Sequence, residues 1–256
     1  MPAPPEDLRA ILFDLDGTLL DSFQSHLEIY QATLARFGIA LKGSDFRRLY
    51  SPDWNEFYGR VGLRREDWDA ASAAWLEEAA GHRPAPFPGV AGALGLLKKR
   101  FRLGLVTAGS ASRVRVDLER GAIARYFDVV VTADDVKEPK PDPEGLRAAL
   151  RGLGIEPRQA LYVGDTEPDY AFARAANVAF IGVTSAFSQP GAERPYDCLA
   201  AVVELPRYLG AGSRRRGSTG RGRLRPIPVG AGRLGLVGTQ VGGVYRRHDE
   251  VLGRHR

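Results

Sequence analysis

The chain alternates short apolar runs with longer stretches in which apolar residues recur every three or four positions. Apolar runs of strand length cover residues 11–13, 103–106, 129–131, 160–163 and 178–181. Helical spacing follows over 90–100, 111–120, 143–153 and 168–176, with a last short strand and helix within 199–209. Such alternation is typical of buried parallel strands joined by helices. It predicts an α/β protein with a doubly wound parallel sheet.

One long interruption follows the first apolar run. Residues 22–85 contain no strand-like run, but apolar residues such as Tyr30 and Leu34 recur at helical spacing, and an alanine-rich stretch and a proline-rich segment follow. We therefore predict a small all-helical cap domain over residues 22–85, inserted after the first strand. The α/β core is then formed by residues 8–21 and 86–209.

Residues 210–256 differ in composition from the rest. Glycine and arginine dominate, lysine is absent and the apolar periodicity is lost, which predicts a disordered tail. The 11 arginines and 2 acidic residues of 211–256 carry +9, whereas the whole chain carries +5, which leaves −4 for residues 1–210. Arginine-rich disorder can bind nucleic acid, with the arginines at 214–216 in the candidate patch, but we favour a linker-like extension.

The remaining composition excludes several classes of protein. With 256 residues, 44% hydrophobic and 26% charged, the chain is typical of a soluble globular protein. No apolar run reaches membrane-spanning length and the N-terminus is not signal-like, so we expect a cytoplasmic protein. Cys198 is the only cysteine, which excludes an intrachain disulfide, a thiolate zinc site and a redox pair.

Two aspartates directly after the first apolar run are the strongest chemical signal. Asp14 and Asp16 are two residues apart, so the period of a strand directs both to one side at its carboxyl end, where parallel sheets bind ligands. Gly17 lets the backbone turn sharply. Carboxylates this close repel, so the site needs a cation, a shared proton or both, and a divalent metal with oxygen ligands fits best. The alternative is an ordinary Asp-Gly turn.

Polar residues also follow three later strands. Thr107 precedes a turn whose free N–H groups suit phosphate oxygens. Lys140 lies in a loop stiffened by prolines, with Lys137 as a competitor. Asp165 and Asp169 are four residues apart across a strand-to-helix turn, so both can face the crevice and bind a metal. Helix capping and a solvated lysine are the structural alternatives for these positions.

Taken in order, these segments resemble the four motifs of the haloacid dehalogenase superfamily. The opening segment matches the first motif, Asp-x-Asp-Gly-Thr, and Thr107 matches the threonine or serine of the second. Lys140 matches the lysine of the third motif, and residues 164–169 match the fourth, Gly-Asp-x-x-x-Asp. The resemblance covers residues from about 8 to 209. The helical insertion is similar to the C1 cap of the phosphoglycolate phosphatase-like branch. Ala108 is a departure, because many relatives carry asparagine after the threonine.

The resemblance implies a Mg²⁺-dependent phosphatase. Asp14 would be the nucleophile that forms an aspartyl-phosphate, and Asp16 the general acid and then the base that activates water. Mg²⁺ would be bound by the Asp14 carboxylate, the Asp16 backbone carbonyl and Asp165, with Asp169 in support. Dehalogenases of the superfamily lack the second aspartate, since cleaving a carbon–halogen bond needs no acid, so Asp16 favours phosphoryl transfer to water.

The resemblance also assigns the substrate contacts. Thr107 and Lys140 would hold the phosphoryl oxygens beside Ala108, and Trp54 and Asn55 of the cap would contact the rest of a small phosphorylated metabolite. One inward cap arginine would suit phosphoglycolate. The other cap candidates are Arg47, Arg48, Tyr50, Tyr58, Arg60, Arg64 and Arg65.

Two alternatives stay open at this point. A sugar-phosphate mutase shares the core residues and differs in its cap contacts. A nucleic-acid-binding protein acting through the basic tail is the less favoured alternative. We expect a monomer or a homodimer.

Overall fold

A six-stranded sheet forms the centre of the molecule. The computed structural model describes residues 4–188 and 194–210, so the predicted tail after Gly210 lies outside the described residues. The strand order is β5-β4-β1-β6-β7-β8, and every neighbouring pair is parallel. The strands are β1 (Ala10–Phe13), β4 (Arg102–Val106), β5 (Val129–Val131), β6 (Ala160–Gly164), β7 (Ala179–Val183) and β8 (Cys198–Leu199).

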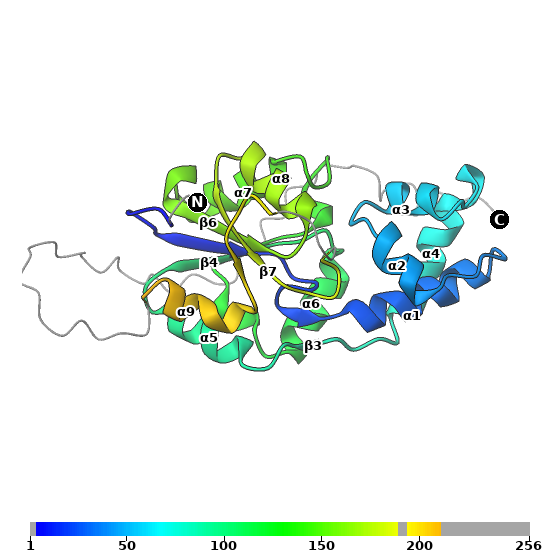
Figure 1. Ribbon diagram of the computed structural model, residues 1–256, viewed down its shortest axis with the longest axis horizontal. Helices are drawn as coiled ribbons and strands as arrows, with labels where there is room; N and C mark the ends of the chain where they lie inside the picture. The colour runs from blue at the N-terminus through cyan, green and yellow to red at the C-terminus, as the bar shows by residue number, and fades with distance from the viewer. Residues whose placement is uncertain (1–3, 189–193, 211–256) are drawn as a thin grey trace, which may run out of the picture.

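Helices cover both faces of this sheet. Figure 1 shows α7 and α8 on one side and α5 and α9 on the other. Alternate residues of β1 explain the arrangement: Ile11 and Phe13 join a core cluster with α5, α6 and α9, whereas Ala10 and Leu12 join one with α7 and α8. The core helices are α5 (Val90–Lys98), α6 (Ala111–Arg120), α7 (Glu144–Leu153), α8 (Glu167–Ala175) and α9 (Leu205–Tyr208). The doubly wound α/β fold is therefore confirmed.

The helical stretch after β1 lies at the carboxyl end of the sheet. Two short antiparallel strands, β2 (Leu20–Asp21) and β3 (Ala85–Pro86), form a ribbon where the chain leaves the core and returns. Every described element between β2 and β3 is a helix, as the spacing predicts. They are α1 (Phe23–Ala35), α2 (Gly43–Leu49), α3 (Trp54–Arg60) and α4 (Trp68–Ala79), with a 3₁₀ turn at Arg65–Asp67. The domain limits at 22 and 85 stay a prediction.

An aromatic cluster holds this cap together. Tyr30 lies 4.3 Å from Phe57 and 5.8 Å from Trp75, measured between ring centroids. Phe187, from the loop after β7, packs against Tyr50 at 4.7 Å and joins the same cluster. Aromatic pairs at these separations add about 0.5–1.5 kcal/mol each beyond burial. The cap is therefore anchored to the core by a side chain of the core.

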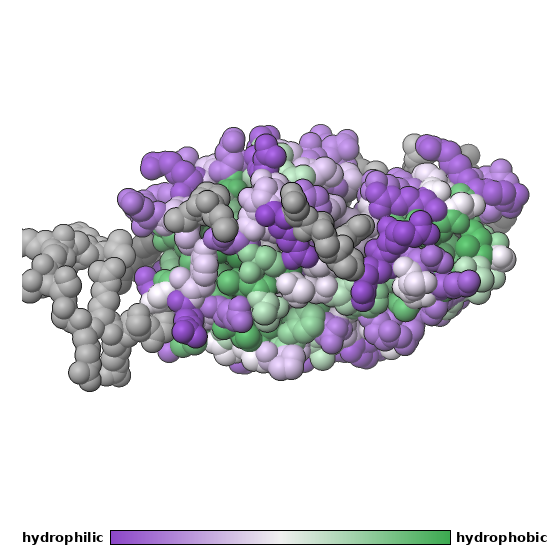
Figure 2. All heavy atoms as spheres, in the orientation of Figure 1, coloured by the Kyte–Doolittle hydropathy of each residue, from purple (hydrophilic) through white to green (hydrophobic). Residues whose placement is uncertain are grey.

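The predicted helices and strands of the core agree with the structure to within two residues. Short 3₁₀ helices, which the spacing does not predict, fill several connections: Ala124–Tyr126, Ala133–Asp135, Pro157–Gln159 and Val202–Glu204. In the described part of the chain, no helix is both long and apolar enough to span a membrane. Figure 2 shows hydrophilic side chains over most of the visible face, with smaller hydrophobic areas between them.

Candidate active site

Strand register brings the ends of the three central strands level. Phe13 pairs with Leu105 of β4 and with Val163 of β6, so β1 ends beside both neighbours. The next residue, Asp14, donates its backbone N–H to the Val163 carbonyl at 2.9 Å and is buried. Its carboxylate therefore starts from a fixed backbone position between the segments that follow β4 and β6.

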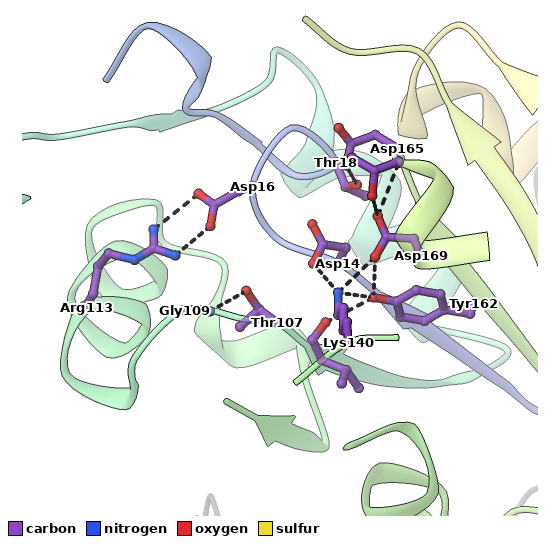
Figure 3. A network of polar contacts seen from close by, with 12 residues as sticks. Asp14, Asp16, Thr18, Thr107, Gly109, Arg113, Lys140, Tyr162, Asp165 and Asp169 are labelled. Carbon is purple, nitrogen blue, oxygen red and sulfur yellow. Dashed lines mark hydrogen bonds and ion pairs between the residues drawn. The ribbon is translucent and has the colours of Figure 1, made fainter. Parts of the chain in front are cut away.

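Lys140 connects the parts of the site. Its Nζ donates to Asp14 Oδ1 at 2.6 Å, to Asp169 Oδ1 at 2.9 Å and to the Tyr162 hydroxyl at 2.6 Å (Figure 3). The hydroxyl of Tyr162 in turn donates to the Val106 carbonyl at 3.1 Å. Lys140 is buried, and three acceptors fill its three donor positions. The proline-flanked loop therefore places Lys140 among the carboxylates, whereas Lys137 lines a cavity that Lys140 also lines.

Three carboxylates form a compact cluster. Asp14, Asp165 and Asp169 each offer an oxygen, and these oxygens lie within 4.8 Å of one another. Thr18 donates to Asp165 Oδ1 at 2.9 Å and Ser185 to its Oδ2 at 2.5 Å. Each oxygen of the Asp165 carboxylate thus accepts a hydrogen bond from a hydroxyl group, which fixes its orientation.

The donor set suits a divalent cation. Three carboxylates and the Lys140 ammonium sum to a formal charge of −2, and hard oxygen ligands are those that Mg²⁺ prefers. Burial raises the pKa of Asp14 to about 7, although Lys140 acts in the opposite direction. Burial and the neighbouring carboxylates raise the pKa of Asp165 well above its usual range. Such shifts indicate that the buried cluster lacks positive charge, which a cation would supply.

Two glycines allow the close approach of these carboxylates. A β-carbon at Gly164 would lie 2.6 Å from Asp169 Cγ, and one at Gly17 would collide with Asp165. Gly17 also has φ of +79°, which disfavours other residues. The glycines of the first and fourth motifs are therefore required by the geometry of the cluster.

The Asp16 side chain lies apart from the cluster. It accepts two hydrogen bonds from the Arg113 guanidinium of α6, at 3.2 Å to Oδ1 and 2.5 Å to Oδ2. Figure 3 shows it directed at Arg113 rather than at Asp14. Burial alone would raise the pKa of Asp16, but Arg113 more than offsets this and holds it well below its usual range. The predicted metal contact through the Asp16 backbone carbonyl stays a prediction.

The predicted substrate residues line one cavity. Thr107, at the end of β4, is buried and accepts a hydrogen bond from the Gly109 N–H at 3.2 Å. A cavity of about 330 Å³ between core and cap is lined by Thr107, Lys140, Ala108, Trp54 and Asn55, among others. The structure thus brings all five predicted substrate contacts to one space.

The cap arginines lie elsewhere, and none of them lines this cavity. Their partners are on the cap itself: Arg48 pairs with Asp45, Arg60 with Glu56, Arg64 with Glu66 and Asp67, while Arg47 and Arg65 lie over the rings of Phe23 and Trp68. Tyr58 is buried within the cap cluster. Tyr50 lines a second, smaller cavity beside Asp16.

Three residues of the site were missed from the sequence. Tyr162 offered a weak signal, because a tyrosine in a buried strand needs a partner for its hydroxyl. Ser185 follows β7 as Asp165 follows β6, so its position at a strand end was a signal too. Arg113 offered none, since it is one of many arginines on helices.

Comparison with known proteins agrees with this geometry. The model of the family described as "Haloacid dehalogenase-like hydrolase" matches residues 11–183. The chain belongs to this family. Within the haloacid dehalogenase-like hydrolases it falls in the phosphoglycolate phosphatase-like branch, as the resemblance of its motifs predicted.

Two curated relatives of this family cover most of the chain. The phosphoglycolate phosphatase of Rhodospirillum rubrum is 33% identical over an alignment of 231 residues, which covers 82% of this chain and 96% of the relative. The pyrophosphatase PpaX of Bacillus velezensis is 34% identical over 179 residues, or 69% and 83%. Both relatives are phosphatases by name.

Solved structures of the family support the fold. CbbY from Rhodobacter sphaeroides, in complex with phosphate, has a TM-score of 0.66 and 25% identity, and covers 77% of this chain and 96% of that one. A HAD-superfamily hydrolase of subfamily IA from Geobacter sulfurreducens has a TM-score of 0.60 and 29% identity, with 82% and 100% covered. The chain is thus a haloacid dehalogenase-like phosphatase.

Proposed function

We propose that the protein is a Mg²⁺-dependent phosphatase that hydrolyses a small phosphorylated metabolite through an aspartyl-phosphate on Asp14. One observation carries the proposal: Asp14, Asp165 and Asp169 converge within 4.8 Å, with Lys140 bonded to two of them, at the edge of a cavity lined by Thr107. Mg²⁺ would be held by these carboxylates and would offset the charge of the phosphoryl group.

Asp14 performs the first displacement in this proposal. A carboxylate oxygen attacks phosphorus, the bond from phosphorus to the ester oxygen breaks, and the leaving oxygen takes a proton from Asp16. Lys140 favours the ionised form of Asp14 by hydrogen bonding to its Oδ1, and so opposes the effect of burial. Lys140 and the Thr107 hydroxyl then hold the phosphoryl oxygens while their charge is redistributed.

Water completes the cycle. Asp16, deprotonated by the first step, takes a proton from a water molecule that attacks phosphorus. The bond between phosphorus and Asp14 breaks, which releases phosphate and restores both aspartates. Asp16 must therefore face the reacting atoms in both steps.

The substrate is a small anionic metabolite in this proposal. The relatives named above act, by their names, on phosphoglycolate and on pyrophosphate. The cavity of about 330 Å³ is of the size that small molecules occupy. Phosphoglycolate and pyrophosphate are thus the first substrates to test. We expect the enzyme to act in the cytoplasm, as a monomer or homodimer.

A phosphate-release screen tests the proposal. Phosphorylated metabolites, including 2-phosphoglycolate, pyrophosphate and a hexose 1-phosphate, are incubated with Mg²⁺ or with EDTA. We expect release only with Mg²⁺, and none from Asp14→Asn. Asp45→Asn, on the cap surface, is the matched control and should retain activity. Release in EDTA, or an active Asp14→Asn variant, would contradict the mechanism, and conversion of the hexose 1-phosphate to its isomer would indicate a mutase.

A further inference from the structure

Asp16 is not positioned to act as a general acid in this structure. Both of its carboxylate oxygens accept hydrogen bonds from Arg113, at 3.2 and 2.5 Å. With both oxygens held by a guanidinium fork, the Asp16 carboxylate is directed at Arg113 rather than at Asp14 (Figure 3), so it does not face the leaving oxygen. Catalysis therefore requires that the pair separate, and another acceptor must replace Asp16 at Arg113 Nη2, because a largely buried donor that loses its acceptor is costly.

The geometry points to Arg113 as the residue that binds a second anionic group of the substrate, a carboxylate or a phosphate, and in doing so releases Asp16 to the reaction. This inference rests on the proposed phosphatase function. The substrate would thus carry one phosphoryl group at Asp14 and one further anionic group at Arg113.

Arg113 is held in place independently of Asp16. Its Nη1 also donates to Asp117 Oδ2 at 3.1 Å, one turn along α6, and the Asp117 side chain is 5% exposed. The Arg113 side chain is 15% exposed, so it is largely shielded from water. When Asp16 leaves, Asp117 keeps the guanidinium oriented, and its planar fork is suited to bidentate binding of another anion.

A small polar cavity adjoins the pair. It has a volume of about 30 Å³, enough for one or two water molecules or a small polar group. Besides Asp16 and Arg113, its lining includes Tyr50 and Trp75 of the cap. The indole N–H of Trp75 is buried and has no hydrogen-bond partner among the residues that the structure describes, which is unusual for a buried donor. This cavity can accept polar atoms that the described side chains do not supply.

The small cavity and the large one share lining residues. Ala108 and Trp54 line both. Gly109 lies between the two, because its N–H donates to Thr107 Oγ1 at 3.2 Å while a β-carbon on it would collide with the Arg113 guanidinium. Arg113 therefore packs against the turn that presents Thr107 to the phosphoryl group. A substrate that binds at both positions would lie along this turn.

The exchange gives Arg113 a new anionic partner. A substrate carboxylate in the place of the Asp16 carboxylate leaves the formal charge around Arg113 unchanged, and a substrate phosphate makes it more negative. The released Asp16 turns toward the phosphoryl group and delivers a proton taken from solvent to the leaving oxygen. It regains one proton from the attacking water and returns it to solvent when it pairs with Arg113 again. A substrate without a second anionic group leaves Asp16 paired with Arg113 and is turned over slowly.

The test compares two substrates that differ only at the second group. In 2-phosphoglycolate a carboxylate stands where ethyl phosphate has a methyl group. We expect Arg113→Gln to lower the ratio of kcat/KM for 2-phosphoglycolate to kcat/KM for ethyl phosphate on the order of 10- to 100-fold, the value of a charged hydrogen bond. Arg115→Gln, exposed on the same helix, is the control and should change neither. Equal losses on both substrates, or no loss, would overturn the inference.

Pyrophosphate distinguishes the two possible anionic groups. If the second group is a phosphate, Arg113→Gln lowers turnover of pyrophosphate more than that of 2-phosphoglycolate, and if it is a carboxylate the order reverses. Both outcomes support an anion site at Arg113. Arg113→Lys keeps the charge without the fork, so it should show a smaller loss of the same selectivity and gives a second variant if Arg113→Gln does not fold.

Binding measurements separate this inference from the proposed function. In the Asp14→Asn background, calorimetry gives the Kd of 2-phosphoglycolate and of ethyl phosphate without turnover. Adding Asp16→Asn removes the competing carboxylate, so it should tighten 2-phosphoglycolate several-fold more than ethyl phosphate. Adding Arg113→Gln should weaken 2-phosphoglycolate alone. If the ratio of the Kd of 2-phosphoglycolate to that of ethyl phosphate is unchanged in both variants, the inference is overturned. An enzyme that hydrolyses no phosphate ester would refute only the proposed function.

Discussion

Replacement of Lys140 by methionine tests the electrostatic account of the site. The two side chains have similar length, so the change removes mainly the ammonium. Lys140 has a 7% exposed side chain and forms salt bridges to Asp14 and Asp169 at 2.6 and 2.9 Å. Among the residues that the structure describes, no other lysine or arginine forms a salt bridge with either carboxylate. The variant therefore leaves three clustered carboxylates without a cation.

The expected cost follows from the geometry. At an effective dielectric constant of about 20, Coulomb's law gives roughly 6 kcal/mol of attraction for each of the two pairs. The desolvation of Lys140 cancels much of this, and breaking a buried pair typically costs about 3–5 kcal/mol. We expect the free energy of unfolding to fall by about that amount in EDTA. Mg²⁺ should restore more stability to the variant than to the parent, since it supplies the missing charge.

Urea unfolding in EDTA and in Mg²⁺ measures both quantities. Lys98→Met is the matched control, because Lys98 pairs with Asp128 at the surface, with a 32% exposed side chain, and such pairs contribute about 0–1 kcal/mol. A loss below about 1 kcal/mol for Lys140→Met in EDTA, or equal stabilisation of parent and variant by Mg²⁺, would refute the reasoning. Activity should fall on the order of 10³-fold, because the phosphoryl oxygens lose a full charge.

Three further predictions concern the supports of the site and cap. Gly164→Ala should weaken Mg²⁺ binding by roughly 10- to 100-fold, because the new β-carbon displaces Asp169, and calorimetry with unchanged affinity would contradict the geometry. Ser185→Ala should weaken Mg²⁺ by about 10-fold without unfolding the protein, since Asp165 loses a donor at 2.5 Å; circular dichroism checks the fold. Phe57→Ala should lower the free energy of unfolding by about 3–5 kcal/mol through a cavity in the cap, and a loss under 1 kcal/mol would show that the aromatic cluster is not a packed core.

Much of the core was predictable because apolar runs and polar strand ends are local signals. The run at 11–13 lies within β1 and Asp14 follows it, as the alternation predicts. The order of the strands is not local: that β1 lies between β4 and β6 depends on how helices pack on both faces. Sequence spacing therefore predicts what each strand presents but not which strands are neighbours.

The charged residues show the limit most clearly. Lys140 was preferred over Lys137 because prolines flank it, and the structure places it among the carboxylates. The sequence did not distinguish among the several arginines of the cap as substrate contacts, and none of them lines the large cavity. Arg113 reaches Asp16 from α6, where Gly109 leaves room for its guanidinium. Which arginine points into the site depends on tertiary packing, and composition and residue spacing do not predict it.

The level ends of the three central strands also affect how activity is gained during folding. Asp14 and Asp165 are distant along the chain, and they meet only when β1 has paired with β6 in the register that aligns Phe13 with Val163. Contacts of such long sequence separation form late, because the loop entropy must be lost first. A partly folded chain can hold its helices and still lack the cluster of Asp14, Asp165 and Asp169. Recovery of phosphatase activity on refolding would therefore report completion of the sheet rather than formation of secondary structure.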